Sequence, residues 1–499
     1  MQLRLVPLLV ILAACGGKSV APPPSPPPPP PAKPAPVAAP AKSLTGIWLG
    51  TLHAGDVDLR VQLHLDLATT PAGCSGDSLD QGVKGIACTD VVATATSLAF
   101  TMPAVHATYT GTVSADGNTI TGTFTQGGPL SLTLTRQATA LEPAAPMPPV
   151  GVDKIQQVMT DDMATLLAGE LAPSTGIGVT IGVIEHGKQT IFSFGAAKPD
   201  SVFEIGSVTK TFTGLVLAQL VQQHQVRLDQ PVRELLPKGT VAKPATGAEI
   251  TLVDLSAQRS GLPRMPDNMA FADPTNPYAD YDAKGLYAYI GKHGVAMPEK
   301  PEFAYSNLGV GLLGQALAEH AHSSYDALVA KQITGPLGMH DTAVTPTPAM
   351  AKRFLDGHGS QHAVVHHWDL AALAGAGALR STAGDMLVFL QAQLHPESVK
   401  GTSPQARTLA AAITASHAIQ GESMPGMHIA FNWFRIDATG EYWHNGATGG
   451  FSSYALFDPD KDFAVVVLVN RGIDDGMLAD NIGTHVAARL AGRLAPPLH

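Results

Sequence analysis

Three short motifs constrain this chain of 499 residues more than any other feature: Ser207-Val-Thr-Lys210, Tyr305-Ser-Asn307 and His444-Asn-Gly446, each present once and in this order. Together they offer a hydroxyl nucleophile, two groups able to move its proton, and a glycine-bearing segment to lie beside a substrate. A serine hydroxyl is a poor nucleophile unless an adjacent base activates it. We therefore expect the fold to bring the three motifs to one catalytic site.

The spacing inside the first motif predicts a helix. Lys210 follows Ser207 by three residues, so in a helix the two side chains share one face, one turn apart. Ser207 would then lie near the helix N-terminus, where unpaired backbone N–H groups favour a developing oxyanion. Apolar residues continue this helix into a core, namely Leu215, Leu217, Leu220 and Val221.

The motifs and their surroundings resemble the serine β-lactamase and penicillin-binding superfamily, specifically its class C-like branch with D-alanyl-D-alanine carboxypeptidase and esterase relatives. Flanking blocks resemble that family in the same order, among them VFEIGSVTKTFTGLVLAQLVQQHQVRLDQPVRELLP, PEFAYSNLGVGLLGQALAEHA and WHNGATGGFSSYALFDPDKDFAVVVLVN. The resemblance runs from about Val152 to the C-terminus. It implies a metal-free serine hydrolase without a cofactor, acting on β-lactams, D-alanyl peptides of peptidoglycan or small esters.

Sequence periodicity in the same region predicts an α/β (α+β) fold. Residues 175–194 read as a hairpin that turns at Gly187, and YALFDPDKDFAVVVLVN near the C-terminus reads as two further strands. Helical periodicity lies between them, at 211–223 and 308–320. We expect an antiparallel sheet completed by N- and C-terminal strands, a helical subdomain, and a site between the two.

The resemblance assigns roles to single residues. Ser207 would be the acylated nucleophile, and Lys210 and Tyr305 would take its proton and pass it to the leaving group. The other residues would hold the substrate and are Asn307, His444, Gly446 and Ala447. Asn307 would also orient the lysine, and the backbone N–H groups of Ser207 and Ala447 would form an oxyanion hole, typically worth roughly 3–4 kcal/mol per donor.

The third motif departs from the Lys-Thr-Gly that dedicated class C β-lactamases usually carry. A lysine there is a fixed positive charge, whereas histidine, with an ordinary pKa of about 6.5, is mostly neutral at pH 7. Losing the charge should leave Tyr305 a weaker base, because tyrosine starts near a pKa of about 10. Asn445 also replaces the usual Thr or Ser. We expect chemistry closer to the carboxypeptidases, D-aminopeptidases and esterases, with carboxylate-bearing substrates binding better as pH falls through the titration of His444.

The first 43 residues predict export and a lipid anchor. A short apolar run, Leu5 to Leu12, ends in Leu-Ala-Ala-Cys-Gly, which resembles a bacterial lipoprotein box with Cys15 as the lipidated residue. The alternative is a plain secretory signal with an incidental cysteine. We expect a signal peptide at 1–14, a proline-rich tether at 15–43 in extended polyproline conformation, and a membrane-anchored periplasmic or cell-surface lipoprotein.

Residues 44–137 predict a small all-β barrel or sandwich. Apolar residues from Val57 to Leu67 alternate strictly with polar ones, as expected for a strand with one buried face, and the block resembles the lipocalin-like modules joined to some exported hydrolases. Cys74 and Cys88 are expected either to form a disulfide in an oxidising compartment or to stay buried thiols. A linker at 138–150 would lead to the hydrolase domain at 151–499.

Other functions find little support in the sequence. The net charge is −10 without a cluster of basic residues, which argues against nucleic-acid binding. Four histidines, His358, His362, His366 and His367, are interpreted as a polar loop rather than a metal site. The competing hypothesis is a binding module: a penicillin sensor or wall-binding lipoprotein whose site no longer turns over.

Overall fold

The computed structural model describes residues 43–498, apart from 55–56, 71, 144, 146, 271 and 473–477. The predicted signal peptide, Cys15 and almost the whole tether lie outside these residues. The chain divides into two compact units, one ending at residue 146 and the other beginning at Met147, and each is described by itself.

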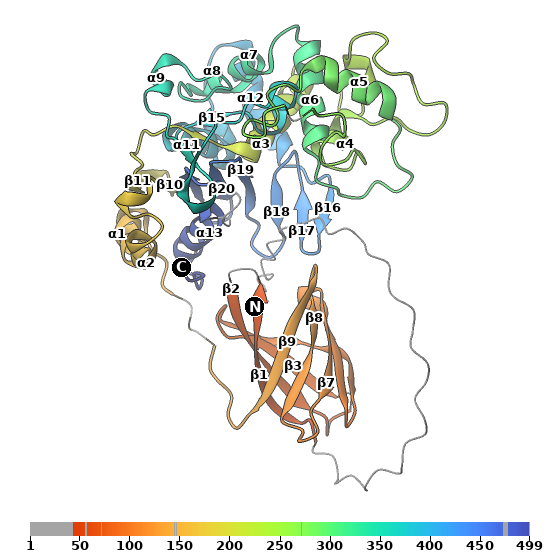
Figure 1. Cartoon of the computed structure of the whole chain (residues 1–499), viewed down its shortest axis with the longest axis vertical. Coiled ribbons are helices and arrows are strands. Elements are labelled where there is room, and N and C mark those ends of the chain that lie inside the picture. Colours follow the sequence, from red (N-terminus) through yellow and green to blue (C-terminus); the bar gives the residue numbers. More distant parts are fainter. Residues whose placement is uncertain are drawn as a thin grey trace. The chain divides into compact units, whose positions relative to one another are not determined.

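The N-terminal unit is a single antiparallel sheet that curls into a barrel-like form (Figure 1), with strand order β4-β3-β2-β1-β9-β8-β7-β6-β5. Its strands are β1 (Gly46–Ala54), β2 (Val57–Asp66), β3 (Gly73–Ser78), β4 (Val83–Ala87), β5 (Thr89–Ala93), β6 (Ser97–Met102), β7 (Ala107–Val113), β8 (Thr119–Thr125) and β9 (Pro129–Gln137).

Alternation builds the core of this unit. Leu59, Leu63 and Leu65 of β2 are buried and join a cluster around Trp48 and Tyr109, because successive side chains of a strand point to opposite faces. A disulfide joins Cys74 to Cys88, with Cα atoms 5.2 Å apart.

The second unit is built on an eight-stranded antiparallel sheet, in the order β11-β10-β21-β20-β19-β18-β17-β16. Its strands are β10 (Gly178–Glu185), β11 (Lys188–Gly195), β16 (Gly421–Met424), β17 (Met427–Ile429), β18 (Phe434–Ile436), β19 (Tyr442–Ala447), β20 (Ser452–Asp458) and β21 (Phe463–Val469). β10 pairs directly with β21, so strands from the beginning and the end of this unit are neighbours in one sheet.

Helices cover both faces of this sheet. In β21, Val465 and Val467 lie in the core beneath helices α1 and α13, whereas Val466 and Leu468 lie in the larger core that includes α11. Continuously buried strands of this kind are typical of sheets covered on both faces. The longer helices are α1 (Val152–Asp162), α3 (Thr209–Gln222), α5 (Ala283–His293), α6 (Asn307–His320), α11 (Ala383–Leu394), α12 (Pro404–Ser416) and α13 (Leu478–Leu490).

Shorter elements complete the helical part. The helices are α2 (Ala164–Ala168), α4 (Leu252–Ser256), α7 (Tyr325–Val329), α8 (Gly335–Leu337), α9 (Pro348–Ala351) and α10 (Ala374–Gly377), and the strand pairs are β12 (Phe203–Glu204) with β15 (Arg380–Ser381) and β13 (Gly357–His358) with β14 (Val364–Val365). Within the described part of the chain, no helix combines the length and the apolar character needed to cross a bilayer.

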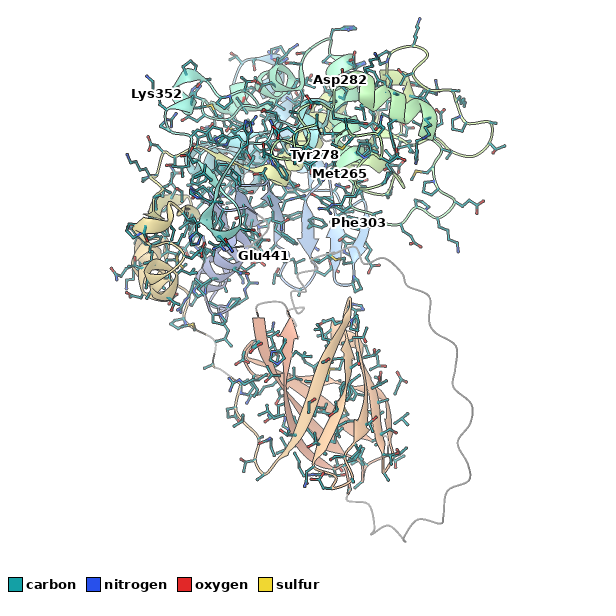
Figure 2. All side chains as sticks on the ribbon, in the orientation of Figure 1. Met265, Tyr278, Asp282, Phe303, Lys352 and Glu441 are labelled. Atoms are coloured by element: carbon teal, nitrogen blue, oxygen red, sulfur yellow. A yellow bond between two sulfur atoms is a disulfide. The ribbon has the colours of Figure 1, made fainter. Side chains whose placement is uncertain are left out.

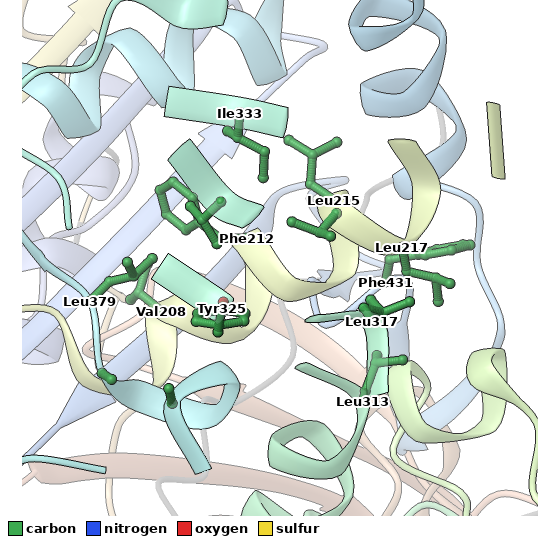
Figure 3. Close-up of a cluster of buried hydrophobic side chains, with 14 of the residues drawn as sticks. Val208, Phe212, Leu215, Leu217, Leu313, Leu317, Tyr325, Ile333, Leu379 and Phe431 are labelled. Carbon is green, nitrogen blue, oxygen red and sulfur yellow. The ribbon is translucent and has the colours of Figure 1, made fainter. Parts of the chain in front are cut away.

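Helix α3 runs through the centre of the helical part and is buried on nearly every side. Figure 3 shows its side chains packed among those of α6 and of neighbouring segments, including Phe212, Leu215, Leu217, Leu313 and Leu317. Apolar residues lie on several sides of this helix, as is typical of a helix enclosed in a core. The residues at its N-terminus therefore have a rigid support.

Candidate active site

Ser207 lies in a single 3₁₀ turn, Gly206–Val208, directly before α3. Gly206 has φ of +45°, and a Cβ atom there would lie 2.6 Å from the backbone nitrogen of Ala447, so this turn requires glycine. The side chain of Ser207 is half-buried, whereas its neighbours are buried. The turn therefore holds one hydroxyl at the edge of an otherwise closed core.

Lys210 is fully buried and lies beside the serine, as the helical spacing predicts. Its Nζ is 2.8 Å from Ser207 Oγ and donates a hydrogen bond to the carbonyl oxygen of Ala376 in α10, at 2.7 Å. Burial, and to a smaller degree the positive charge of Arg264, lower the pKa of Lys210 well below its ordinary value. The neutral amine is thereby favoured, and its lone pair can accept the serine proton.

Tyr305 precedes α6 and brings the second motif to the same place. The centroid of its ring is 4.8 Å from Lys210 Nζ. Burial raises the pKa of Tyr305 to about 12, and the interactions with Ser207 and Arg264 offset this only in part. The hydroxyl is therefore protonated at neutral pH and suited to donate a proton, in line with the weaker base expected from the sequence.

Asn307 begins α6, and its side-chain amide donates to the sulfur of Met265 at 3.5 Å. Figure 2 labels Met265 and Tyr278, both in the helical part of this unit. The observed second partner of Lys210 is the carbonyl of Ala376, so that carbonyl orients the amine in this structure. An orienting role for Asn307 remains a prediction.

Strand β19 carries the third motif past the serine. His444 and Gly446 are buried on this strand, and a Cβ atom on Gly446 would lie 2.1 Å from the carbonyl oxygen of Ile205 and 2.8 Å from the nitrogen of Ser207. Only glycine permits so close an approach. The same approach places the N–H groups of Ser207 and Ala447 on adjoining backbone segments, as an oxyanion hole requires.

His444 is a neutral group in this environment. Its Nδ1 donates to the carbonyl oxygen of Asn445 at 2.5 Å, since a carbonyl can only accept, and the ring centroid is 6.3 Å from that of Tyr305. Burial lowers the pKa of His444 to about 3. We expected carboxylate-bearing substrates to bind better as pH falls through the titration of His444. With so low a pKa, the ring gains no positive charge near neutral pH, so the structure does not support that expectation.

Asn445 does not share the face of its neighbours. Its Nδ2 donates to Oδ1 of Asp480 in α13 at 2.7 Å, because alternate residues of a strand point to opposite sides. The middle residue of the third motif consequently joins β19 to helix α13, on the face of the sheet away from Ser207.

The histidine-rich segment is divided among separate partners. His358 hydrogen-bonds through Nδ1 to the carbonyl of His362, His362 contacts Glu170, and the ring of His367 stacks on Phe354. No group of three or more possible metal ligands occurs among residues that the structure describes.

Two groups at the site were missed by sequence reasoning: the Ala376 carbonyl and the Arg264 guanidinium. Ala376 lies in the segment AGAGALRSTAGDMLVFL, within the region that resembles the family, but nothing in a sequence shows which carbonyl faces a buried amine. Arg264 directly follows the segment ITLVDLSAQRSGLP, which lies within the region that resembles the family, and this position was the signal that could have pointed to it.

Comparisons with known proteins agree with this geometry. Residues 163–488 match the model of the Beta-lactamase family. The D-alanyl-D-alanine-carboxypeptidase/endopeptidase AmpH of Escherichia coli is 30% identical over 322 residues, covering 60% of this chain and 80% of the relative. Penicillin-binding protein 4 of Amycolatopsis lactamdurans is 26% identical over 357 residues, covering 67% of this chain and 86% of the relative. A class C beta-lactamase mutant of known structure covers 68% of this chain and 98% of its own, with 20% identity and a TM-score of 0.56.

Fold, site and relatives together define a serine hydrolase of the β-lactamase and DD-peptidase type. The structural neighbour supports the α/β fold, and the class predicted from the three motifs is confirmed. The chain belongs to the beta-lactamase family.

Proposed function

We propose that this protein is a membrane-tethered hydrolase that cleaves D-alanyl peptides of the cell wall through an acyl-enzyme on Ser207. The observation that carries the proposal is the buried Lys210 amine, 2.8 Å from Ser207 Oγ. The neutral third motif argues for peptides over efficient β-lactam turnover, and the carboxypeptidase AmpH among the relatives supports that choice.

The mechanism follows from the positions of the three side chains. Ser207 Oγ attacks the substrate carbonyl while its proton passes to the neutral Lys210 amine. The tetrahedral oxyanion is held by the N–H groups of Ser207 and Ala447. Tyr305, protonated at neutral pH, donates its proton to the leaving nitrogen and recovers one from the Lys210 ammonium. Water then attacks the acyl-enzyme with the same groups acting in reverse.

The remaining groups have supporting roles. Asn307 and the His444 ring border the substrate, and Gly446 lets the strand approach the serine. Export through residues 1–14, lipidation of Cys15 and a tether at 15–43 would hold the β-rich unit and the hydrolase near the cell wall. The proposed domain limits are 44–137 for the β-rich unit, 138–150 for the linker and 151–499 for the hydrolase.

The test uses the full chain and its Ser207→Ala variant. Each is incubated with benzylpenicillin and with a diacetyl-lysyl-D-alanyl-D-alanine peptide, while intact mass and released product are followed together. We expect a long-lived penicillin adduct and D-alanine release from the wild type alone. A rapid penicillin product would make it a β-lactamase, an adduct without any turnover would make it a penicillin sensor, and no adduct at all would refute the proposal.

A further inference from the structure

The third motif of this chain offers no positive charge to a substrate. His444 is 1% exposed and neutral near pH 7, and the Asn445 side chain is turned to Asp480. Lys210 is not available to bind a substrate carboxylate either, because its Nζ contacts Ser207 Oγ and the Ala376 carbonyl. A carboxylate on the substrate would have to find its partner elsewhere in the site.

Arg264 places a permanent cation beside Tyr305. It is an exposed residue, and its guanidinium carbon lies 5.3 Å from the centroid of the Tyr305 ring. Its charge acts on Lys210 and Tyr305, lowering the pKa of each, and in the same direction on Tyr278. Arginine stays charged at every relevant pH, so this charge does not depend on titration.

The backbone of Arg264 is tied to the second catalytic motif. Its carbonyl oxygen accepts hydrogen bonds from the N–H groups of Asn307, at 3.0 Å, and Leu308, at 3.2 Å. The hydroxyl of Ser306 donates to the preceding carbonyl, that of Pro263, at 2.7 Å. These hydrogen bonds hold the backbone of Arg264, from which the guanidinium extends, next to the N-terminus of α6.

The guanidinium itself has no acidic partner among the described residues. Other arginines of the same unit are paired with carboxylates: Arg233 with Glu249, Arg259 with Asp254, Arg353 with Asp341, Arg380 with Asp369, Arg489 with Asp162 and Arg493 with Glu441. A cation at an active site that pairs with no carboxylate in the described part of the chain is suited to bind one that a ligand brings.

We propose that Arg264 binds the free carboxylate of the substrate's leaving amino acid and so selects peptides with an unblocked C-terminus. This inference rests on the proposed function. Tyr305 delivers the proton to the leaving nitrogen, and Arg264 lies over the same ring. In a C-terminal amino acid the carboxylate is attached to the carbon next to that nitrogen, so it lies near the tyrosine as well. The planar guanidinium can hold it through two parallel hydrogen bonds.

The test compares a peptide acid with its blocked counterpart. Diacetyl-lysyl-D-alanyl-D-alanine, the same peptide with a C-terminal amide, and p-nitrophenyl acetate are offered to the full chain and to Arg264→Gln and Arg264→Lys variants. Arg227→Gln is the matched control, because Arg227 is an exposed arginine outside the site. Peptide binding to Ser207→Ala and to the Ser207→Ala/Arg264→Gln double variant is measured by calorimetry.

We expect the wild type to prefer the acid over the amide in kcat/KM by roughly 10- to 100-fold, the range for hydrogen bonds to a charged group. Arg264→Gln should reduce this preference to about twofold, Arg264→Lys should keep part of it, and Arg227→Gln should match the wild type. The inference would be overturned if Arg264→Gln lost kcat/KM equally on the acid and the amide, or if the wild type showed no preference between them. Turnover of the ester in that case would show that the protein is still a hydrolase. If no substrate is turned over, the proposed function fails, and calorimetry alone tests the role of Arg264. That role is refuted if the Ser207→Ala/Arg264→Gln double variant binds the peptide acid as tightly as Ser207→Ala does.

Discussion

Replacing Lys210 with methionine separates catalysis from stability. The amine is buried and has two hydrogen-bond partners among the described residues, Ser207 Oγ and the Ala376 carbonyl. Methionine keeps most of the side-chain volume but has no lone pair to accept the serine proton. A positioned base typically contributes a factor of roughly 10² to 10⁴, which corresponds to about 3–5.5 kcal/mol in the barrier. We expect acylation of Lys210→Met to slow by about that factor.

The same substitution should lower the free energy of unfolding at pH 7 by less than the loss of one buried hydrogen bond alone would. The Ala376 carbonyl loses its donor, which costs about 1–3 kcal/mol. Against this, the variant no longer has to transfer a lysine that is protonated in the unfolded chain into a site that lowers its pKa, and each pKa unit of that shift corresponds to about 1.4 kcal/mol. The two effects oppose each other.

The sign of the pH dependence gives an independent check. The unfolded lysine binds its proton up to a pH of about 10.4, whereas the folded one releases it at lower pH. Wild-type stability therefore rises with pH between the folded and the unfolded pKa, and Lys210→Met should show a flatter profile there. Acylation is followed by intact mass with benzylpenicillin, and unfolding by circular dichroism at several pH values. Acylation of Lys210→Met within about threefold of the wild type would refute the role of the amine as the base.

Four further outcomes follow from the structure. Tyr305→Phe should slow peptide cleavage by roughly 10² to 10⁴, measured as D-alanine release, and an unchanged rate would exclude it as the proton donor. Because the pKa of His444 is about 3, the KM for a carboxylate-bearing peptide should stay constant from about pH 5 to about pH 8, and a KM that falls toward pH 5 would contradict a neutral ring. Burial raises the pKa of Asp480 to about 8, so folding loses stability as pH rises from about 4 to 8. Asp480→Asn should remove that loss, on the order of 4 kcal/mol at pH 7, and a denaturant titration showing the wild-type pH slope in the variant would argue against it. Replacing Cys74 and Cys88 with serine opens a loop with a sequence separation of 14 and should cost the β-rich unit roughly 3 kcal/mol, which a thermal melt in the presence and absence of reductant would reveal.

Local patterns were sufficient for much of the architecture. Alternation in β2, the hairpin around Gly187 and the apolar periodicity of α3 and α6 are properties of a few consecutive residues, and they appear where the sequence predicts them. The three motifs were equally visible, because the chemistry of acyl transfer demands particular side chains at short spacings. The family and the class of reaction followed from them.

Charge states and long-range partners depended on the tertiary structure. The neutral His444, the proton-donating Tyr305 and the lowered pKa of Lys210 arise from burial by segments far away in the chain, which no local pattern records. The same holds for the Ala376 carbonyl, 166 residues from its lysine.

The sequence alone determined which reaction this protein is equipped for, since nucleophile, base and glycine strand must be present as residue types. The tertiary structure alone decided how the charge is distributed around them. It turns Asn445 away from the site and brings Arg264 over the Tyr305 ring. The physical reason is that residue identity is fixed by the chain, whereas solvation and electrostatic interaction depend on which distant groups the fold places within a few ångströms of one another.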